Sequence, residues 1–240
     1  MARDLPSVGP PSGGLVYRVG RGEDAFAPPP WEYVFKDGTF NNRYDDPRAD
    51  RNVPEEERFR VIYCATRRAG AYGETIAPYR KSLSLLASLQ EIDDDEPLDR
   101  ELEGGIVPKE YRAQRVLGTT RLSDGLRFAD IGNGETYTVL RAELAQWLVK
   151  LGLADLDLSA ITSSQRRLSQ EVARYVYELA DEGHTFFSGI RYPSRLNVEW
   201  ELWAIFCNRM EHSPEEVAGV IVEDDPELQE AAKVLGVRIE

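Results

Sequence analysis

Long apolar runs are missing from this sequence of 240 residues. No stretch of about 18 consecutive apolar residues occurs, so no membrane-spanning helix is expected. The first residues, MARDLPSVGPPSGG, lack the apolar core of a secretory signal. Their proline and glycine content indicates a flexible arm over residues 1–14.

Cysteine and histidine are scarce. Cys64 and Cys207 each lie in an apolar run typical of a strand, and we expect both thiols to be buried. The cytoplasm is the default compartment for such a chain. The two histidines, His184 and His212, are not spaced as ligands with either cysteine, so the sequence predicts no zinc site and no other metal.

Positive charge is also in deficit, since 29 Lys and Arg face 42 Asp and Glu and the net charge is −13. Such an acidic surface repels phosphate backbones, which argues against DNA or RNA as a direct target. Part of the excess lies in EIDDDEPLDRELEGG (91–105). This segment reads as a solvated loop or, alternatively, as a docking surface for a basic partner.

Glycine-rich phosphate loops are absent, because neither GxGxxG nor GxxxxGK[ST] occurs. The patterns that are present do not alternate regularly between strand and helix. They predict a single α+β domain with a mixed, mainly antiparallel sheet and flanking helices. Strands are expected at 15–19, 59–65, 113–122, 126–131, 185–192 and 198–207, and helices at 69–89 with a break at Pro78, at 138–153, and from a capping box at Thr162 and Gln165 onward.

The segment FRVIYCATRRAGAYGETIAPYR (59–80) contains an isolated acid in an unusual setting. A buried strand leads into a helix that carries Glu74, eleven positions after Tyr63. Small neighbours such as Ala71 and Gly73 would leave room for a ligand beside the carboxylate. Taken alone, a helical glutamate is usually solvated and a strand tyrosine usually belongs to the core.

Five segments occur in an order that is similar to a known family: LVYRVGRG, NNRYDDP, RVIYCATRRAGAYGETIA, SSQRRLSQEVARYVYE and FFSGIRYPSRLN. Together they resemble the RES domain family, named for an arginine, a glutamate and a serine. The resemblance covers residues 15–208, and we expect residues 209–240 to form an extension that packs on the same domain. It implies a fold similar to ADP-ribosyltransferase toxins, with NAD as the substrate.

The resemblance also assigns residues. Glu74 matches the family glutamate, Tyr63 the tyrosine before it, Ser194 in RYPSR the serine, and Arg18 an arginine on the first strand. Without the resemblance, Ser194 would be a turn residue after Pro193.

The family arginine can be aligned in two ways. Arg43 in NRYDDP fits the turn and the Asp-Asp-Pro that follows it, although Asn42 stands where the family usually has glycine. The nearby GTF would instead put Thr39 in the arginine's position. We prefer Arg43, whose alternative role is that of a surface turn residue.

The resemblance implies an NAD glycohydrolase, an NAD phosphorylase or a mono-ADP-ribosyltransferase, acting as the toxin of a toxin–antitoxin pair. The antitoxin would be a separate chain resembling Xre-type helix-turn-helix repressors. A different possibility is a non-catalytic module that keeps the fold and binds a protein partner. A third is a one-carboxylate hydrolase of another nucleotide.

The chemistry of NAD cleavage suits a single carboxylate. Nicotinamide leaves as a neutral molecule, so no second acid is needed, and positive charge gathers on the ribose as in glycoside hydrolysis. Glu74 would stabilise that charge, and Arg18 and Arg43 would bind the two phosphates. Tyr63 would stack on an aromatic ring, whereas Ser194 would act either at the nicotinamide end or by holding Glu74.

Overall fold

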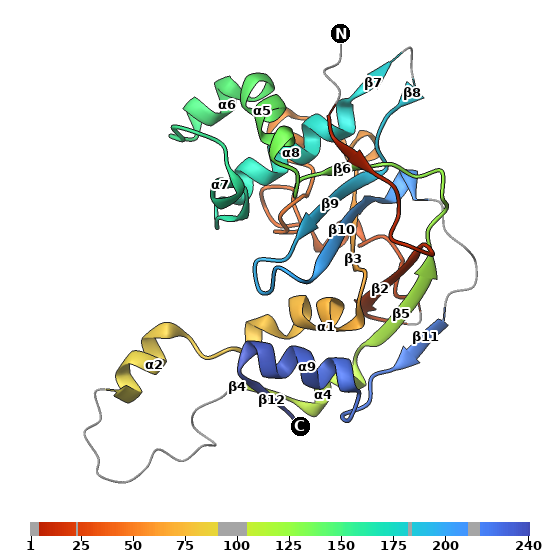
Figure 1. Ribbon diagram of the computed structural model, residues 1–240, viewed down its shortest axis with the longest axis vertical. Helices are drawn as coiled ribbons and strands as arrows, with labels where there is room; N and C mark the ends of the chain where they lie inside the picture. The colour runs from red at the N-terminus through yellow and green to blue at the C-terminus, as the bar shows by residue number, and fades with distance from the viewer. Residues whose placement is uncertain (1–4, 23, 91–104, 182–183, 211–216) are drawn as a thin grey trace.

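The computed structural model describes residues 5–22, 24–90, 105–181, 184–210 and 217–240. Its centre is an eight-stranded sheet in the order β1-β6-β9-β10-β3-β2-β5-β11 (Figure 1). The pair β6–β9 is parallel and the other neighbouring pairs are antiparallel. The prediction of an α+β fold with a mainly antiparallel sheet is therefore confirmed.

The strands of this sheet are β1 (Ser7–Val8), β2 (Leu15–Gly20), β3 (Val61–Ala65), β5 (Val116–Arg121), β6 (Phe128–Asp130), β9 (Gly189–Pro193), β10 (Glu201–Phe206) and β11 (Val217–Val220). Two small sheets pair β4 (Gly105–Val107) with β12 (Val237–Ile239), and β7 (Ala180–Asp181) with β8 (His184–Thr185). The helices are α1 (Arg68–Ile76), α2 (Leu83–Gln90), α4 (Lys109–Ala113), α5 (Gly134–Glu143), α6 (Ala145–Lys150), α7 (Leu158–Thr162), α8 (Arg166–Glu178) and α9 (Pro226–Leu235). Short 3-10 turns lie at η1 (Trp31–Tyr33), η2 (Arg48–Arg51), η3 (Glu55–Glu57), η4 (Ala77–Tyr79) and η5 (Cys207–Arg209).

The central strands β3 and β10 are buried on both faces, as their nearly continuous apolar sequences predict. Along β10, Ala204 and Phe206 belong to the core beneath α8, whereas Trp203 and Ile205 point into a separate cluster on the opposite face. Cys64 of β3 is buried in that second cluster, while Cys207 is only half-buried at the end of β10. Val198, the first residue of the strand expected at 198–207, is instead exposed in the turn before β10.

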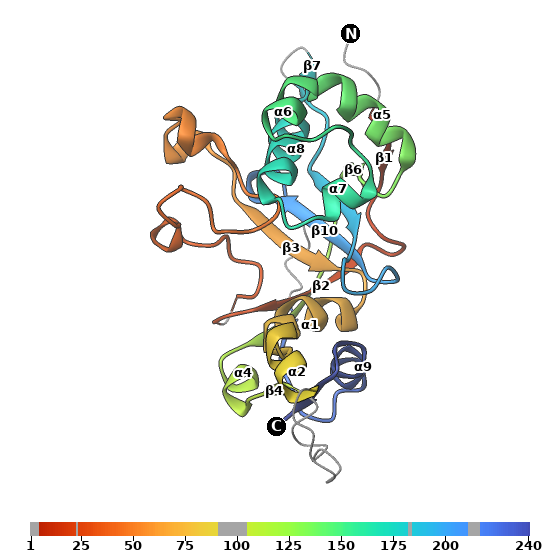
Figure 2. The same cartoon turned by 90° about the vertical axis from the view of Figure 1, so that its left-hand side faces the viewer.

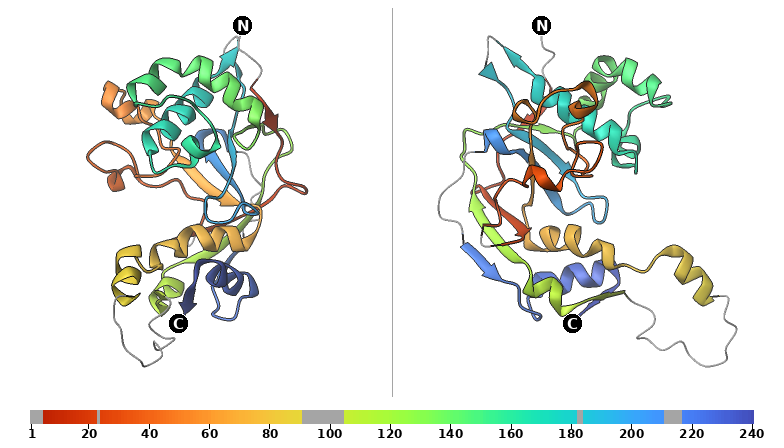
Figure 3. Two further views of the ribbon diagram at one scale, coloured as in Figure 1. Left: turned by 60° about the vertical axis from the view of Figure 1, so that its left-hand side comes forward. Right: turned by 180° about the vertical axis from the view of Figure 1, so that it is seen from behind.

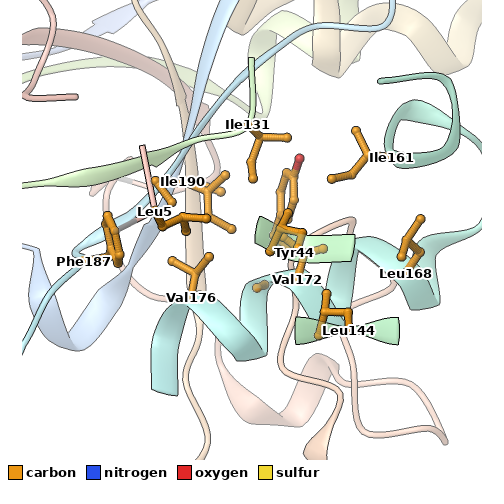
Figure 4. Close-up of a cluster of buried hydrophobic side chains, with 14 of the residues drawn as sticks. Leu5, Tyr44, Ile131, Leu144, Ile161, Leu168, Val172, Val176, Phe187 and Ile190 are labelled. Atoms are coloured by element: carbon orange, nitrogen blue, oxygen red, sulfur yellow. The ribbon is translucent and has the colours of Figure 1, made fainter. Parts of the chain in front are cut away.

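Helices α5 to α8 gather above one half of the sheet and cover the largest core (Figures 1 and 4). Helix α8 contributes Leu168, Val172 and Val176 at helical spacing, and each is fully buried. Tyr44 lies among these side chains in Figure 4, so the turn at residues 41–45 is anchored in the core.

Two helix boundaries differ from the sequence-based prediction. Thr162 does not cap α8 but ends α7, where its hydroxyl donates back to the carbonyl of Leu158. Helix α8 begins at Arg166, after Gln165. The helix expected at 138–153 is divided at Leu144 into α5 and α6, although Leu140, Leu144 and Leu148 remain buried on one stripe.

One buried carboxylate fastens α8 to the preceding part of the chain. Glu171 is fully buried, accepts hydrogen bonds from Arg51 at 2.5 Å and Arg174 at 2.8 Å, and forms an ion pair with Arg167 at 2.9 Å. Such a charge is tolerated in a core only when it is fully paired. The network holds η2 against α8.

Residues near both termini contact the sheet or its helices. Ser7 and Val8, which the sequence assigns to a flexible arm, pair with β6, and Leu5 is buried. Strand β11 pairs with β5 at the sheet edge, and α9 lies beside α1 in all views (Figures 1, 2 and 3). The hydroxyl of Tyr72 donates to Asp225 at 2.9 Å.

No helix among the described residues is long and apolar enough to cross a membrane. The acidic segment 91–105 lies outside the described residues except for Gly105, and His212 also lies outside them.

Candidate active site

A cavity of about 730 Å³ lies where α1, the central strands and the N-terminus of α8 meet. Four of the residues singled out in the sequence line it: Arg18, Arg43, Tyr63 and Glu74. Ser194 is buried and hydrogen-bonds to Glu74, which lines the cavity. Thr39 is buried and bonds to Asp37 and to the amide of Asn41 within its own turn.

Glu74 and Ser194 meet across 120 positions of sequence. The Ser194 hydroxyl donates to Glu74 Oε1 at 2.6 Å and accepts from the amide of Leu196 at 3.0 Å. Ser194 is buried, and its own amide donates to the carbonyl of Trp200. The serine thus links the β9–β10 turn to α1 and orients the carboxylate.

The environment of Glu74 changes its acidity. Its side chain is accessible through the cavity, yet the surrounding walls remove enough water to raise the pKa of the carboxyl above the usual value. The hydrogen bond from Ser194 and the charges of Arg195 and Arg43 oppose this increase. Two cations and a hydroxyl donor therefore favour the ionised form of the carboxyl and partly offset the effect of burial.

Arg43 has well-defined partners at its site. Its Nη1 donates to the carbonyl of Ile161 at 2.7 Å, and its Nη2 donates to that of Ser163 at 3.2 Å. These bonds tie the end of α7 to the turn and fix the direction of the guanidinium. The remaining N–H groups of the fork stay available on a group that lines the cavity.

The hydroxyl of Tyr63 holds the turn that carries Arg43. It accepts from the amide of Tyr44 at 2.9 Å and bonds to the buried carboxyl of Asp45. Asp45 in turn accepts from the amide of Asn42 at 2.7 Å. Tyr63 occupies the middle of β3, where it lines the cavity while its hydroxyl supports the turn.

Arg18 also combines a cavity position with backbone contacts. Its Nε donates to the carbonyl of Ala25 at 2.6 Å, and its Nη1 donates to that of Tyr63 at 3.2 Å. The side chain therefore joins the segment after β2 to β3.

Three further arginines also line the cavity: Arg80, Arg166 and Arg195. The sequence reasoning did not single them out. Arg166 donates to the side-chain oxygen of Asn41, and Arg195 follows Ser194 directly. Both lie inside the quoted family segments, but nothing in the sequence distinguishes them from solvated charges. With Arg18 and Arg43 they make five arginines in the lining of a cavity that Glu74 also lines, in a chain whose net charge is −13.

The expectation for Gly73 is wrong. A Cβ built at this glycine would lie 2.1 Å from Cζ3 of the buried Trp200, so Gly73 faces the core. Gly70 and Ala71 line the cavity instead. A helix turns about 100° per residue, so small residues that are close in sequence can lie on different faces of α1, one toward the core and one toward the cavity.

The arrangement can bind an anionic ligand and stabilise a developing cation beside it. Guanidinium groups bind phosphates through charge-assisted hydrogen bonds, and a fixed carboxylate stabilises positive charge. Within the described residues, no group of three or more His, Cys, Asp or Glu side chains could hold a metal ion.

Comparison with protein families finds a match to the RES domain over residues 15–228. The match extends beyond the expected limit at residue 208 and includes the beginning of α9. A comparison with curated proteins finds no match.

Proposed function

This chain belongs to the RES domain family, which is associated with NAD processing, and from this premise we propose that it cleaves the nicotinamide–ribose bond of NAD. One observation carries the proposal. A serine-held carboxylate faces a cavity lined by five arginines, in a protein that is otherwise strongly acidic. This combination suits a substrate with two phosphates next to a centre that becomes positive.

Glu74 acts in the transition state under this proposal. As nicotinamide departs, its electron pair leaves with it and the ribose becomes oxocarbenium-like. The ionised carboxylate stabilises that charge, and Ser194 keeps Oε1 in place throughout. Tyr192, which also lines the cavity, is near enough for the charge of Glu74 to contribute to its raised pKa, after burial.

The arginines bind the diphosphate. Arg43 is oriented by the carbonyls at 161–163, and Arg18 by those of Ala25 and Tyr63, so both guanidinium groups are held before the ligand arrives. Such preorganisation reduces the entropy that binding must overcome. Water, phosphate or a protein side chain then attacks the ribose, which distinguishes a glycohydrolase, a phosphorylase and a mono-ADP-ribosyltransferase.

The direct test is release of nicotinamide from NAD by purified protein, with and without phosphate and protein acceptors. Glu74→Gln should lower kcat by about 10²–10³-fold, since it keeps the hydrogen-bond acceptor for Ser194 but removes the charge. Glu143→Gln on the exposed side of α5 is the matched control and should match the wild type. Tight NAD binding without any nicotinamide release would instead favour the non-catalytic module.

The cellular role follows from the same chemistry. We propose that expression of this chain alone depletes NAD and stops growth, and that a separate helix-turn-helix antitoxin relieves the effect. Glu74→Gln expressed at the same level should permit growth. Growth arrest by both proteins, with NAD unchanged, would contradict toxicity through NAD consumption.

A further inference from the structure

We propose that Arg195 makes this site specific for a phosphorylated substrate, by binding the phosphate attached to the ribose from which nicotinamide departs. The inference rests on the proposed function and assigns one residue to one part of the substrate. Arg195 follows Ser194 in the β9–β10 turn and lines the cavity. It is not among the residues that the family resemblance identifies.

Two of the five arginines that line the cavity, Arg195 and Arg80, have no side-chain hydrogen bond to the described residues, and of these two only Arg195 has a charge that acts on the Glu74 carboxyl. Arg18 and Arg43 each donate to two or more backbone carbonyls, and Arg166 donates to Asn41. Across the described parts of the chain, the guanidinium of Arg195 has no hydrogen bond and no ion pair within 4 Å. Its complete fork of five N–H donors is therefore available to a ligand.

The surrounding charges favour an anion at this point. Burial lowers the pKa of Arg195, and the charges of Arg43 and Arg166 lower it further. The charge of Glu74 opposes them. Three cations with one carboxylate leave an excess of positive charge, which a phosphate group would neutralise.

The position along the substrate follows from Glu74. In the proposed reaction Glu74 acts on the ribose that carries nicotinamide, and the C5′ of that ribose carries the first phosphate. Arg195 and Arg43 are the two arginines whose charges act on the Glu74 carboxyl. Arg43 donates part of its fork to the carbonyls at 161–163 and keeps only its remaining N–H groups for the diphosphate, whereas Arg195 can offer its complete fork to the phosphate next to the ribose.

The test compares three substrates that share the bond to be cleaved: NAD, nicotinamide mononucleotide and nicotinamide riboside, which lacks phosphate. Arg195→Gln should lower kcat/KM for NAD and for the mononucleotide at least tenfold, mainly through KM. The value for the riboside should change less than threefold. Each rate is measured on the alkaline plateau of that variant's pH profile, so that a shift in the pKa of Glu74 does not contribute.

Arg141→Gln on α5 is the matched control, because this exposed arginine pairs only with Asp155 among the described residues. It should behave as the wild type with all three substrates. Arg195→Lys keeps the charge but not the planar fork and should recover part of the loss. The thermal midpoint of Arg195→Gln should equal that of the wild type, since the side chain has no hydrogen bond to lose.

An equal loss for all three substrates, or no loss for any, would overturn the assignment of Arg195 while leaving the proposed function intact. If the wild type cleaves none of them, the proposed function fails, and binding of ADP-ribose then decides the role of Arg195. A tenfold weaker affinity of Arg195→Gln for ADP-ribose, with unchanged affinity for adenosine, supports the phosphate site. Unchanged affinity for ADP-ribose refutes it.

Discussion

Ser194 and Glu74 are joined by a hydrogen bond of 2.6 Å, although they come from the β9–β10 turn and from α1. The serine is buried and the glutamate is accessible, so one fixes the other at the cavity wall. The sequence leaves two roles open for Ser194, either at the nicotinamide end or in holding Glu74, and the geometry favours the holding of Glu74. Because its hydroxyl is committed to Glu74 and to the amide of Leu196, we propose that Ser194 acts through the carboxylate.

The first prediction concerns Ser194→Ala. Hydrogen bonds to charged groups contribute about 1.5–3 kcal/mol, so loss of this bond should lower kcat about 10- to 100-fold. The effect on KM for NAD should be small, because the phosphates are bound elsewhere. Steady-state kinetics of nicotinamide release measure both values, with Ser12→Ala in an exposed turn as the control. A variant changed only in KM would place Ser194 at the ligand instead.

The second prediction concerns pH. In the proposed reaction Glu74 acts as a carboxylate, and burial raises its pKa, so kcat should fall on acidification at a higher pH than an ordinary glutamate would give. Ser194→Ala removes a bond that stabilises the charged form. The acidic limb of its profile should therefore move to still higher pH.

The pH profiles of two further variants serve as controls for this prediction. Arg195→Gln removes a positive charge that favours the carboxylate and should move the limb in the same direction. Glu74→Gln should have low activity and no such limb. An acidic limb that persists unchanged in Glu74→Gln would mean that another group titrates.

The third prediction concerns Arg43→Ala, which should raise KM for NAD at least tenfold, since a charged hydrogen bond contributes about 1.5–3 kcal/mol and about 1.4 kcal/mol corresponds to a tenfold change. The thermal midpoint should also fall, because the bonds to the carbonyls of Ile161 and Ser163 are lost. Thr39→Ala tests the competing alignment. It should lower stability through its bond to Asp37 but leave KM unchanged.

The fourth prediction concerns Gly73→Ala. The added methyl would collide with the Trp200 ring at 2.1 Å, and overpacking of this kind costs about 1–3 kcal/mol. The better helix propensity of alanine offsets about 1 kcal/mol at most. Because α1 carries Glu74, displacement of the helix should also weaken the contact with Ser194 and lower kcat.

Two further variants isolate the collision. Gly134→Ala in α5 has no atom within 4 Å of the added Cβ and should not be destabilised. Trp200→Leu frees space beside α1, so the double variant with Gly73→Ala should be more stable than the sum of the single effects. Additive changes in the free energy of unfolding would show that the added methyl does not collide with Trp200, which would contradict this prediction.

The local elements were largely determined by sequence. Apolar runs at 15–19 and 59–65 predict β2 and β3, and Pro78 marks the break between α1 and α2. These signals depend on residues close in the chain, whose apolar side chains recur with the period of a strand or of a helix. The α+β class and the order of the family segments could be read in the same way. Boundaries set by local hydrogen bonds, such as the end of α7 at Thr162, could not.

The constellation at the cavity was decided only by tertiary structure. Sequence order identifies Glu74 and Ser194 separately, but their contact requires α1 and the β9–β10 turn to pack through Trp200 and Gly73. Likewise, no pattern distinguishes Arg195 from a solvated arginine until the fold sets it beside Glu74 and leaves it without a hydrogen-bond partner in the described chain. The physical reason is that charge interactions act through space: their strength depends on distance and on the water excluded by surrounding walls, and neither quantity exists before the strands and helices are assembled.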